Sequence, residues 1–210
     1  MEKLHVEKMV LGQVSTNCYL AVNKQTKEVI LIDPADAARR IEKKIKDLGG
    51  KPVAVLLTHG HFDHIGAASE LGNLYDIMIY AHEAEQEIME NSMLNLSANF
   101  GDPFGAEPDM LLSDGQELIL AGMKVQVLHT PGHTKGGVCY YFPEEDIVFS
   151  GDSLFHCSIG RTDFPTGSMS ELVRAVKDKL FVLPDNVKVY PGHGEETTIR
   201  YEKKYNPFLN

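Results

Sequence analysis

Short runs of β-branched and aliphatic residues recur along the chain, and each predicts a strand because such side chains suit a buried, pleated surface. The expected strands are Val6–Leu11, Tyr19–Val22, Val29–Ile32, Val53–Leu57, Ile77–Ala81, Glu117–Leu120, Lys124–Leu128, Val138–Phe142, Ile147–Phe149 and Val187–Tyr190. Many strands with few helices between them indicate an α/β (α+β) protein with mixed sheets covered by helices. The pattern excludes a helical bundle and a pure β-sandwich.

Helical periodicity is clear in two places. The first predicted helix carries four apolar side chains on one face, at Ala37, Ile41, Ile45 and Leu48, and ends at Gly49 and Gly50. The second begins at Ser168, whose hydroxyl is expected to cap the backbone while Glu171 reaches back in a capping box. Its apolar stripe is Leu172, Val176 and Leu180. Further helices are predicted over Ala67–Leu71, Glu83–Glu90 and Thr198–Tyr205.

The stretch from Asn91 to Asp109 has little periodicity and contains several glycines and prolines. Structureless connections of this length are more often binding loops or lids than inert links. Two interpretations of its aromatic residues stay open. Phe100 and Phe104 either line a substrate cleft or anchor the long loop to the core.

Four segments share one pattern, in which a hydrophobic strand is followed by a turn and then by histidine or aspartate. The segments are Val53–His64, Val125–His133, Ile147–Asp152 and Val187–Gly194. Strand ends are rigid, and the glycines and prolines that follow let the backbone turn sharply. We therefore expect the four strands to direct their polar side chains at one point.

The first cluster, from His59 to His64, indicates how these side chains are arranged. Residues two apart point in nearly opposite directions on a helix but lie on one side of an extended segment. His59 and His61 can therefore share a metal only if they leave a strand. Asp63 and His64 come after the turn and face differently, which predicts two adjacent metal sites.

The remaining ligands come from the other three segments. Asp152 is the candidate bridging carboxylate between two ions about 3.5–4 Å apart. The expected ligands are His59, His61 and His133 for the first ion and Asp63, His64 and His193 for the second. Imidazole and carboxylate suit Zn, Fe or Mn. We expect two divalent ions per chain, with zinc as the expected metal and iron or manganese as alternatives.

Such a pair of ions predicts hydrolytic chemistry. A bound metal lowers the pKa of water towards about 7, so a hydroxide is available at neutral pH. Asp63 is expected to act both as a ligand and as the catalytic residue that orients this hydroxide.

Charge and cysteine content restrict the partners and the compartment. The 210 residues contain 20 Lys plus Arg and 30 Asp plus Glu, a net charge of −10 that repels nucleic acid and anionic membranes. The three cysteines are widely spaced, which suits a reducing compartment. With no apolar signal segment and no membrane-spanning run, we expect one cytoplasmic domain over residues 1–210 with no nucleic-acid or membrane partner. The sequence gives no signal of oligomeric state.

The His-x-His-x-Asp-His run at 59–64, with His133, Asp152 and His193, resembles the metallo-β-lactamase fold superfamily over nearly the whole chain. Four words resemble its glyoxalase II branch, the hydroxyacylglutathione hydrolases: Thr130–Thr134, Ser150–Ser153, Gly160–Phe164 and Pro191–Gly194. The chain is most similar to compact bacterial members that lack the C-terminal helical domain. This resemblance implies a four-layer αββα sandwich, a dinuclear metal centre at its edge, and hydrolysis of a small acylthiol ester such as S-D-lactoylglutathione.

Two other functions stay open. Persulfide dioxygenases share the metal motif and the Gly-Arg-Thr-Asp-Phe word, and resemblance to them implies a single iron at His59, His133 and Asp152. The presence of Asp63, His64 and His193 favours the hydrolase, because a mononuclear oxygenase does not need them as ligands. A metal-binding module without catalysis is the third interpretation.

Three residues are candidates for substrate contacts. Arg161 follows Asp152 in a loop, where its guanidinium can pair with a substrate carboxylate or with Asp163. Lys135 and Tyr140 are the other candidates. His129, at the end of a ligand-bearing strand, is a candidate partner for a metal ligand.

Overall fold

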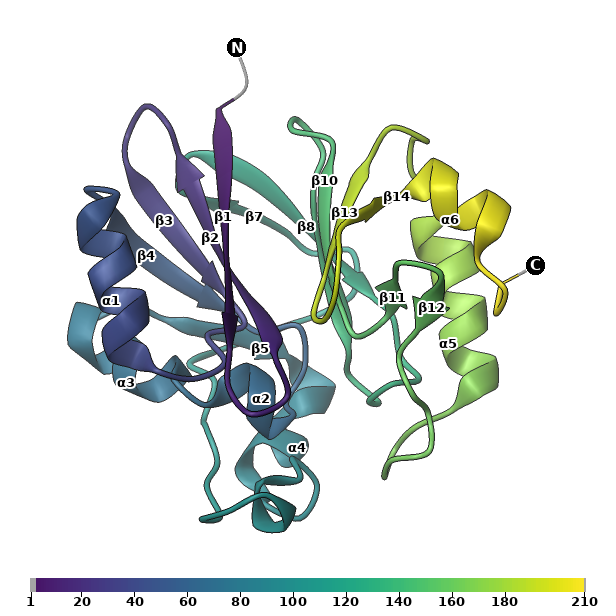
Figure 1. Ribbon diagram of the computed structural model, residues 1–210, viewed down its shortest axis with the longest axis horizontal. Helices are drawn as coiled ribbons and strands as arrows, with labels where there is room; N and C mark the ends of the chain where they lie inside the picture. Colours follow the sequence, from purple (N-terminus) through teal and green to yellow (C-terminus); the bar gives the residue numbers. More distant parts are fainter. Residues whose placement is uncertain (1–2, 210) are drawn as a thin grey trace.

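The protein is a sandwich of two β-sheets with helices on both outer faces, as Figure 1 shows. The computed structural model describes residues 3–209. Helices α1 (Ala38–Asp47) and α3 (Ala68–Tyr75) cover the first sheet, and α5 (Met169–Ala175) and α6 (Ile199–Tyr205) cover the second. This arrangement confirms the expected αββα layers.

The first sheet has six strands in chain order. They are β1 (Leu4–Leu11), β2 (Thr16–Asn23), β3 (Glu28–Ile32), β4 (Lys51–Leu56), β5 (Ile79–His82) and β6 (Met110–Leu112). β1, β2 and β3 pair antiparallel, whereas β3, β4, β5 and β6 pair parallel. Parallel neighbours need a crossover connection, and α1 and α3 provide two of them. The carboxyl ends of β3 and β4 consequently lie at the same edge.

The second sheet also has six strands, in the order β14-β13-β10-β9-β8-β7. Their bounds are β7 (Glu117–Leu120), β8 (Met123–His129), β9 (Val138–Phe142), β10 (Ile147–Gly151), β13 (Lys188–Pro191) and β14 (Thr197–Thr198). Only β10 and β13 pair parallel within this sheet, and the helical segment of α5 and the following π-helical turn Val176–Leu180 connects them. β10 and β13 therefore also end at one edge.

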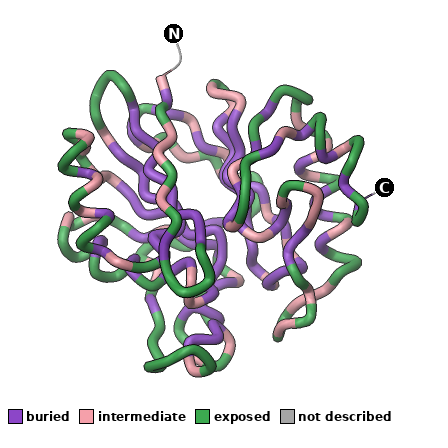
Figure 2. Tube along the Cα trace, in the orientation of Figure 1, coloured by how far each residue is buried: buried purple, intermediate pink, exposed green. Residues whose placement is uncertain are grey.

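Three hydrophobic clusters hold the layers together. One fills the space between the sheets, and the others lie between each sheet and its helices. All eight residues of β2 are buried, with Leu20 facing the helices and Tyr19 facing the second sheet. A strand covered on both faces favours apolar residues at successive positions, which explains the run Cys18–Val22, and the buried polar residues of β2 lie at its ends. Figure 2 shows this burial concentrated in the strands.

All ten expected strands are present within a few residues of their predicted bounds, but several short elements were not predicted. They are β6, β14, the two-residue strands β11 (Leu154–Phe155) and β12 (Ser158–Ile159), helix α2 (Phe62–Ile65) and the 3-10 turn Ser97–Asn99. The predicted helix over 83–90 is a 3-10 turn, Glu83–Glu85, followed by α4 (Gln86–Glu90). Elements of two to four residues are too short to show a periodic pattern in the sequence. Whether they form depends on the neighbouring segments with which they pair.

The prediction of a capping box at the start of α5 is wrong. Ser168 occupies the N-cap position, but its side chain makes no capping hydrogen bond and instead lies 3.4 Å from the Ser170 hydroxyl. Its backbone amide donates to the Gly132 carbonyl at 2.8 Å, so the amide that Glu171 was expected to bind is already occupied. A tertiary contact therefore replaces the local cap. Within residues 3–209, no helix combines the length and apolar composition needed to cross a bilayer.

Candidate metal centre

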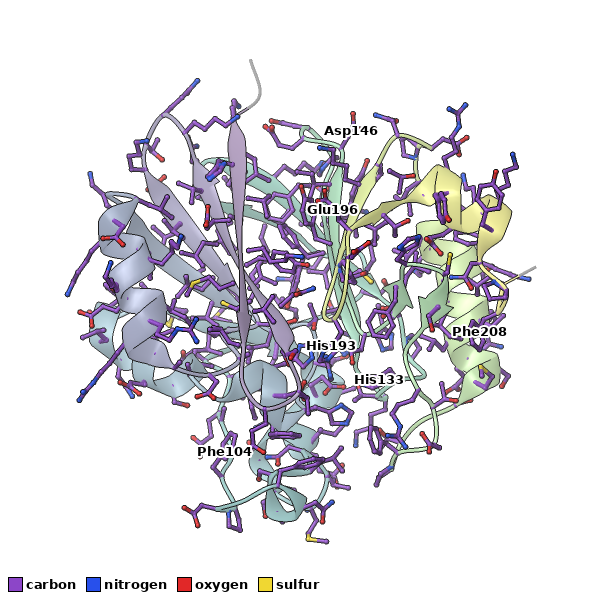
Figure 3. All side chains as sticks on the ribbon, in the orientation of Figure 1. Phe104, His133, Asp146, His193, Glu196 and Phe208 are labelled. Carbon is purple, nitrogen blue, oxygen red and sulfur yellow. The ribbon has the colours of Figure 1, made fainter. Side chains whose placement is uncertain are left out.

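The seven predicted ligands converge at the edge where strands of both sheets end. His59 and His61 follow β4, and α2 carries Asp63 and His64. From the second sheet, His133 follows β8, Asp152 follows β10 and His193 follows β13. Figure 3 shows His133 and His193 close together at the lower middle of the sandwich. The seven residues form three groups whose ligand atoms lie within 4.8 Å of one another: His59/His61/His133, Asp63/His64/His193 and His59/His64/Asp152.

The first group consists of three buried histidines. His61 Nδ1 lies 3.0 Å from His133 Nε2, and the His59 ring centroid is 4.8 Å from each of the other two. Burial, reinforced by the neighbouring imidazoles, holds the pKa of His59 and of His61 well below the ordinary value. These two rings are therefore neutral at pH 7, with lone pairs available for a cation.

The second group surrounds a carboxylate. Asp63 Oδ2 is 3.4 Å from His64 Nε2 and 3.3 Å from His193 Nε2. Burial alone raises the pKa of Asp63, but His64, His193 and the Thr16 hydroxyl outweigh it and lower that pKa below its ordinary value. Burial alone lowers the pKa of His64, whereas Asp63 and two further aspartates raise it to about 10. Opposite charges thus stabilise each other in this group without an ion.

Asp152 faces both groups. Its Oδ1 lies 3.4 Å from His64 Nε2, and its Oδ2 lies 3.4 Å from His133 Nε2 and 3.6 Å from His193 Nε2. Its two oxygens reach histidines predicted for different ions. This is the position expected of a bridging carboxylate.

The donors fit a pair of divalent cations. Nε2 of His59 and His64 and Oδ1 of Asp152 are buried and make no hydrogen bond among the described residues, although His64 Nε2 lies 3.4 Å from Asp63 and Asp152. Buried polar atoms are otherwise almost always paired, and leaving them unpaired is costly. Nitrogen and carboxylate oxygen atoms that converge in this way are suitable ligands for Zn, Fe or Mn.

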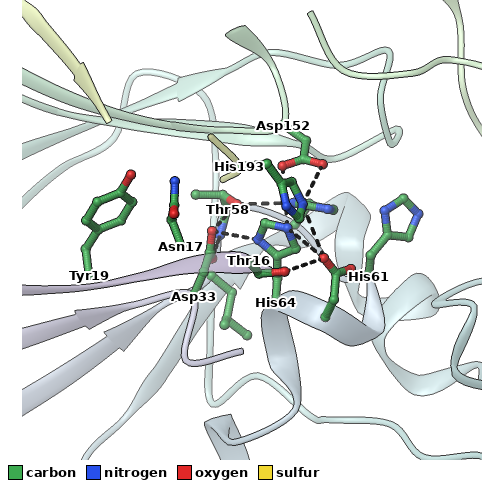
Figure 4. A network of polar contacts seen from close by, with 12 residues as sticks. Thr16, Asn17, Tyr19, Asp33, Thr58, His61, His64, Asp152 and His193 are labelled. Carbon is green, nitrogen blue, oxygen red and sulfur yellow. Dashed lines mark hydrogen bonds and ion pairs between the residues drawn. The ribbon is translucent and has the colours of Figure 1, made fainter. Parts of the chain in front are cut away.

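Asp33 organises two of the histidines and was missed by sequence reasoning. It accepts hydrogen bonds from the Thr58 amide at 2.8 Å, the Thr58 hydroxyl at 2.6 Å and His64 Nδ1 at 2.9 Å. Because the Thr58 hydroxyl donates to Asp33, it accepts from His59 Nδ1 at 3.1 Å. Both rings are thereby held with Nε2 facing the centre, as Figure 4 shows for His64. Asp33 directly follows β3, just as Asp152 follows β10, and this shared pattern was a usable signal.

Other contacts orient the remaining ligands. His133 Nδ1 donates to the Arg161 carbonyl at 2.7 Å, which leaves Nε2 for a cation. The Thr16 hydroxyl donates to Asp63 Oδ2 at 2.7 Å. Asn17 donates through Nδ2 to the carbonyls of Pro191 and Gly194, at 2.9 and 3.0 Å, and so fixes the turn that carries His193. The start of β2 therefore supports the centre from the first sheet.

Glu85 is a fully buried carboxylate that joins two turns of the site. Its Oε2 accepts from the Gly60 amide and its Oε1 from the Gly136 amide, each at 2.7 Å. Gly60 lies between His59 and His61, and Gly136 lies in the turn that follows His133. Burial raises the pKa of Glu85 to about 7 despite these hydrogen bonds. Its position after β5 was not recognised in the sequence.

The three residues predicted to contact substrate lie in different environments, two at the surface and one in the core. Arg161 donates from Nε and Nη2 to both oxygens of Asp163 at 2.7 Å, which is the alternative pairing considered above. Lys135 pairs with Glu87 at the surface. Tyr140 is fully buried between the sheets and donates to the Leu57 carbonyl at 2.8 Å. The prediction that Tyr140 contacts substrate is therefore wrong.

His129 does not contact a metal ligand through its ring in the described structure. Its Nε2 donates to the Lys135 carbonyl at 3.0 Å, and its ring stacks on His82 with centroids 4.1 Å apart. At the end of β8, the His129 side chain therefore binds the turn that contains Lys135 and not a metal ligand.

The fold and the site together define a metal-binding protein of the metallo-hydrolase type. The chain belongs to the metallo-β-lactamase superfamily, whose model matches residues 11–193. It is 38% identical over 205 residues to the probable metallo-hydrolase YqgX of Bacillus subtilis, covering 97% of this chain and 96% of that protein. It is 35% identical over 213 residues to the hydroxyacylglutathione hydrolase GloC of Haemophilus influenzae, covering 99% of each. The predicted family is confirmed.

Solved structures agree with this assignment. The BLEG-1 B3 metallo-β-lactamase is 39% identical with a TM-score of 0.93, covering 98% of this chain and 99% of that one. TTHA1623 in a di-iron-bound form is 37% identical with a TM-score of 0.87, covering 97% and 100%. ETHE1 from Myxococcus xanthus is 30% identical with a TM-score of 0.81, covering 97% and 83%. These three proteins share the fold, but one is described as a metallo-β-lactamase, one as a di-iron-bound protein and one as ETHE1.

Proposed function

We propose that this protein is a dinuclear metal-dependent hydrolase that cleaves a small acylthiol ester such as S-D-lactoylglutathione. The observation that carries the proposal is the position of Asp152 between two groups of ligands, one of three histidines and one containing Asp63. The full-length similarity to GloC supports a thioester as substrate. We propose zinc as the ion, with iron as the alternative because a relative of known structure holds two irons.

The chemistry divides between the ions and the side chains. Bound divalent cations supply a water of lowered pKa and polarise the carbonyl of the substrate. The chain holds their ligands in place, with Asp33 and the Arg161 carbonyl fixing the histidine rings. Asp63 is ionised at neutral pH and can accept a hydrogen bond from the attacking water. A thiolate leaves with little acid help, so no proton donor is required.

The proposal also covers compartment and partner. Cys18 and Cys139 are buried free thiols, and Cys157 is a partly buried one. Free thiols persist in reducing compartments. We therefore propose a cytoplasmic enzyme whose partner is the small thioester itself.

Substitution of metal ligands tests the proposal. In zinc-loaded protein, His59→Ala and Asp152→Ala should each lose at least about a hundredfold in kcat/KM for S-D-lactoylglutathione, because each removes a ligand from a shared centre. His5→Ala, on the exposed start of β1, is the control and should keep wild-type activity. Activity close to wild type in both ligand variants would end the proposal.

A persulfide dioxygenase is the second candidate, and the Gly-Arg-Thr-Asp-Phe word at residues 160–164 favours it. Metal content per chain and oxygen uptake on glutathione persulfide separate the two candidates. Two ions without oxygen uptake support the hydrolase, whereas one iron with oxygen uptake supports the dioxygenase. A β-lactam belongs in the same assay because of the likeness to BLEG-1. Tight metal binding with no turnover of any substrate would leave a non-catalytic metal-binding module.

A further inference from the structure

An aromatic ring from the long 91–109 segment lies beside the turn that carries the metal ligands. Phe100 stacks on Phe62, with ring centroids 4.5 Å apart and an interplanar angle of 17°. Phe62 stands between the candidate ligands His61 and Asp63 at the start of α2. The stacked pair is thus bonded through the Phe62 backbone to the segment that carries these two ligands.

Hydrogen bonds fix this segment against α2. The Phe62 amide donates to the Asn95 carbonyl at 2.8 Å. The buried Asn95 side chain donates in turn to the carbonyls of Met89 and Phe104, at 3.1 and 2.8 Å. These hydrogen bonds hold the 91–109 segment against α2 and so support the contact between Phe100 and Phe62.

The exposure of Phe100 indicates that it does more than anchor the segment. An aromatic anchor is expected to be buried, yet 46% of Phe100 is exposed. Phe104, in the same segment, is 39% exposed but lies in the lower projection of the molecule, away from the labelled His133 and His193 in Figure 3. Of the two phenylalanines, Phe100 is the one whose ring contacts the ligand-bearing segment, through Phe62.

A second ring borders the same histidine. Phe164 meets His61 edge to face, with centroids 5.4 Å apart, and lies 6.3 Å from the His133 ring. The Arg161 guanidinium packs over Phe164, 4.0 Å from its centroid. Phe164 therefore adjoins the first group of ligands, while the Phe62–Phe100 pair lies on the segment that carries His61.

We infer that Phe100, stacked on Phe62, is a specificity-determining residue that binds a flat apolar group of the thioester substrate. The inference rests on the proposed function and narrows its substrate class to thioesters with an aromatic or similarly flat apolar substituent. A half-exposed ring gains by covering its apolar surface, and ring pairs add a further contribution, which together correspond to about a tenfold preference. The apolar group lies on either the acyl or the thiol side of the bond that breaks.

The test compares paired thioesters in wild type and in Phe100→Ala, a residue outside the ligand set. The acyl arm compares phenylacetyl with acetyl thioesters of N-acetylcysteamine, and the thiol arm compares S-benzyl with S-methyl thioacetate. In one arm the ratio of kcat/KM values for the aromatic over the small substrate should fall about tenfold on Phe100→Ala. Dividing the wild-type ratio by the variant ratio removes differences in intrinsic reactivity. Metal content checks that each variant keeps its centre.

Phe104→Ala is the matched control, since it removes the same side chain from the same segment. It should keep the wild-type ratio, and Phe100→Tyr should largely restore it. If wild type hydrolyses these thioesters but Phe100→Ala leaves both ratios unchanged, or Phe104→Ala lowers them equally, the inference is overturned and the proposed function stands. If wild type hydrolyses no thioester, the proposed function and the inference that rests on it are both overturned.

Discussion

Two buried carboxylates at this centre act by accepting hydrogen bonds from the chain. Asp33 accepts from Thr58 and His64, and Glu85 accepts from the amides of Gly60 and Gly136. Gly60 and Gly136 bind different oxygens of Glu85, and a glutamine in its place would present one oxygen and one NH2 group to the two amides. At the scale of single residues, the geometry of the centre therefore depends on acids that were not among the predicted ligands.

Glu85→Gln tests this role through the pH dependence of stability. Burial raises the pKa of Glu85 in the folded protein from 4.5 to about 7, so the folded state binds this proton more tightly than the unfolded state. The resulting stabilisation is complete below the unfolded pKa and is lost as pH rises through the folded pKa. Since glutamine does not titrate, the unfolding free energy of wild type minus that of Glu85→Gln should fall by roughly 3 kcal/mol between about pH 5 and pH 8.

Urea unfolding with a chelator present measures this difference. Glu87→Gln is the control, because Glu87 is exposed and its difference from wild type should stay within about 0.5 kcal/mol over the same range. A difference that does not change with pH for Glu85→Gln would show that the carboxyl titrates normally.

At the scale of elements, the turns after the strands determine whether the ligands meet. The turn after β13 passes very close to Asp152. A Cβ on Gly192 would lie 2.2 Å from Asp152 Oδ1 and 2.7 Å from His64 Cε1, whereas a Cβ on Gly194 meets nothing within 4 Å. Gly194 has a φ of +78°, so a side chain there causes backbone strain only.

These two glycines give a matched pair of variants. Gly192→Ala should reduce metal content well below that of wild type, because the added methyl displaces two predicted ligands. Gly194→Ala should keep the wild-type metal content and lose about 1–2 kcal/mol of stability from the strained φ. Metal analysis after gel filtration and urea unfolding with a chelator measure the two effects. Equal metal loss in both variants would contradict the steric explanation.

At the scale of the whole molecule, the centre connects the two sheets. The turn after β4 brings His59 and His61 from the first sheet, while β10 and β13 bring Asp152 and His193 from the second. A cation held by both sets of ligands binds the folded chain and not the unfolded one. Metal binding should therefore stabilise the packing of one sheet on the other.

Metal removal measures this stabilisation. An ion present at a thousand times its Kd adds about 4 kcal/mol to the unfolding free energy. For a chain of this size, that corresponds to a fall in Tm of about 10 °C when a chelator removes the ions. The Asp152→Ala variant should show a smaller fall, because it binds the ions weakly from the start. An unchanged Tm in wild type would show that the sheets do not depend on the metal.

The sequence by itself determined the strands and the predicted ligands. Hydrophobic runs are local features, and a histidine or aspartate directly after such a run must lie at a strand end. This reasoning placed His59, Asp152 and His193 at one edge, where the structure brings them together around Asp152. Asp33 was missed, although the same pattern follows β3.

Only the tertiary structure decided the contacts between distant segments. In β9 every residue is buried, so no alternation showed that Tyr140 faces the other sheet and not the substrate. The Ser168 amide donates to the Gly132 carbonyl in place of the predicted local cap. Glu85 accepts hydrogen bonds from amides that are 25 and 51 residues away in the sequence. Local sequence sets the preference of each segment, but the hydrogen-bond partner of a buried polar group depends on which segments pack against it.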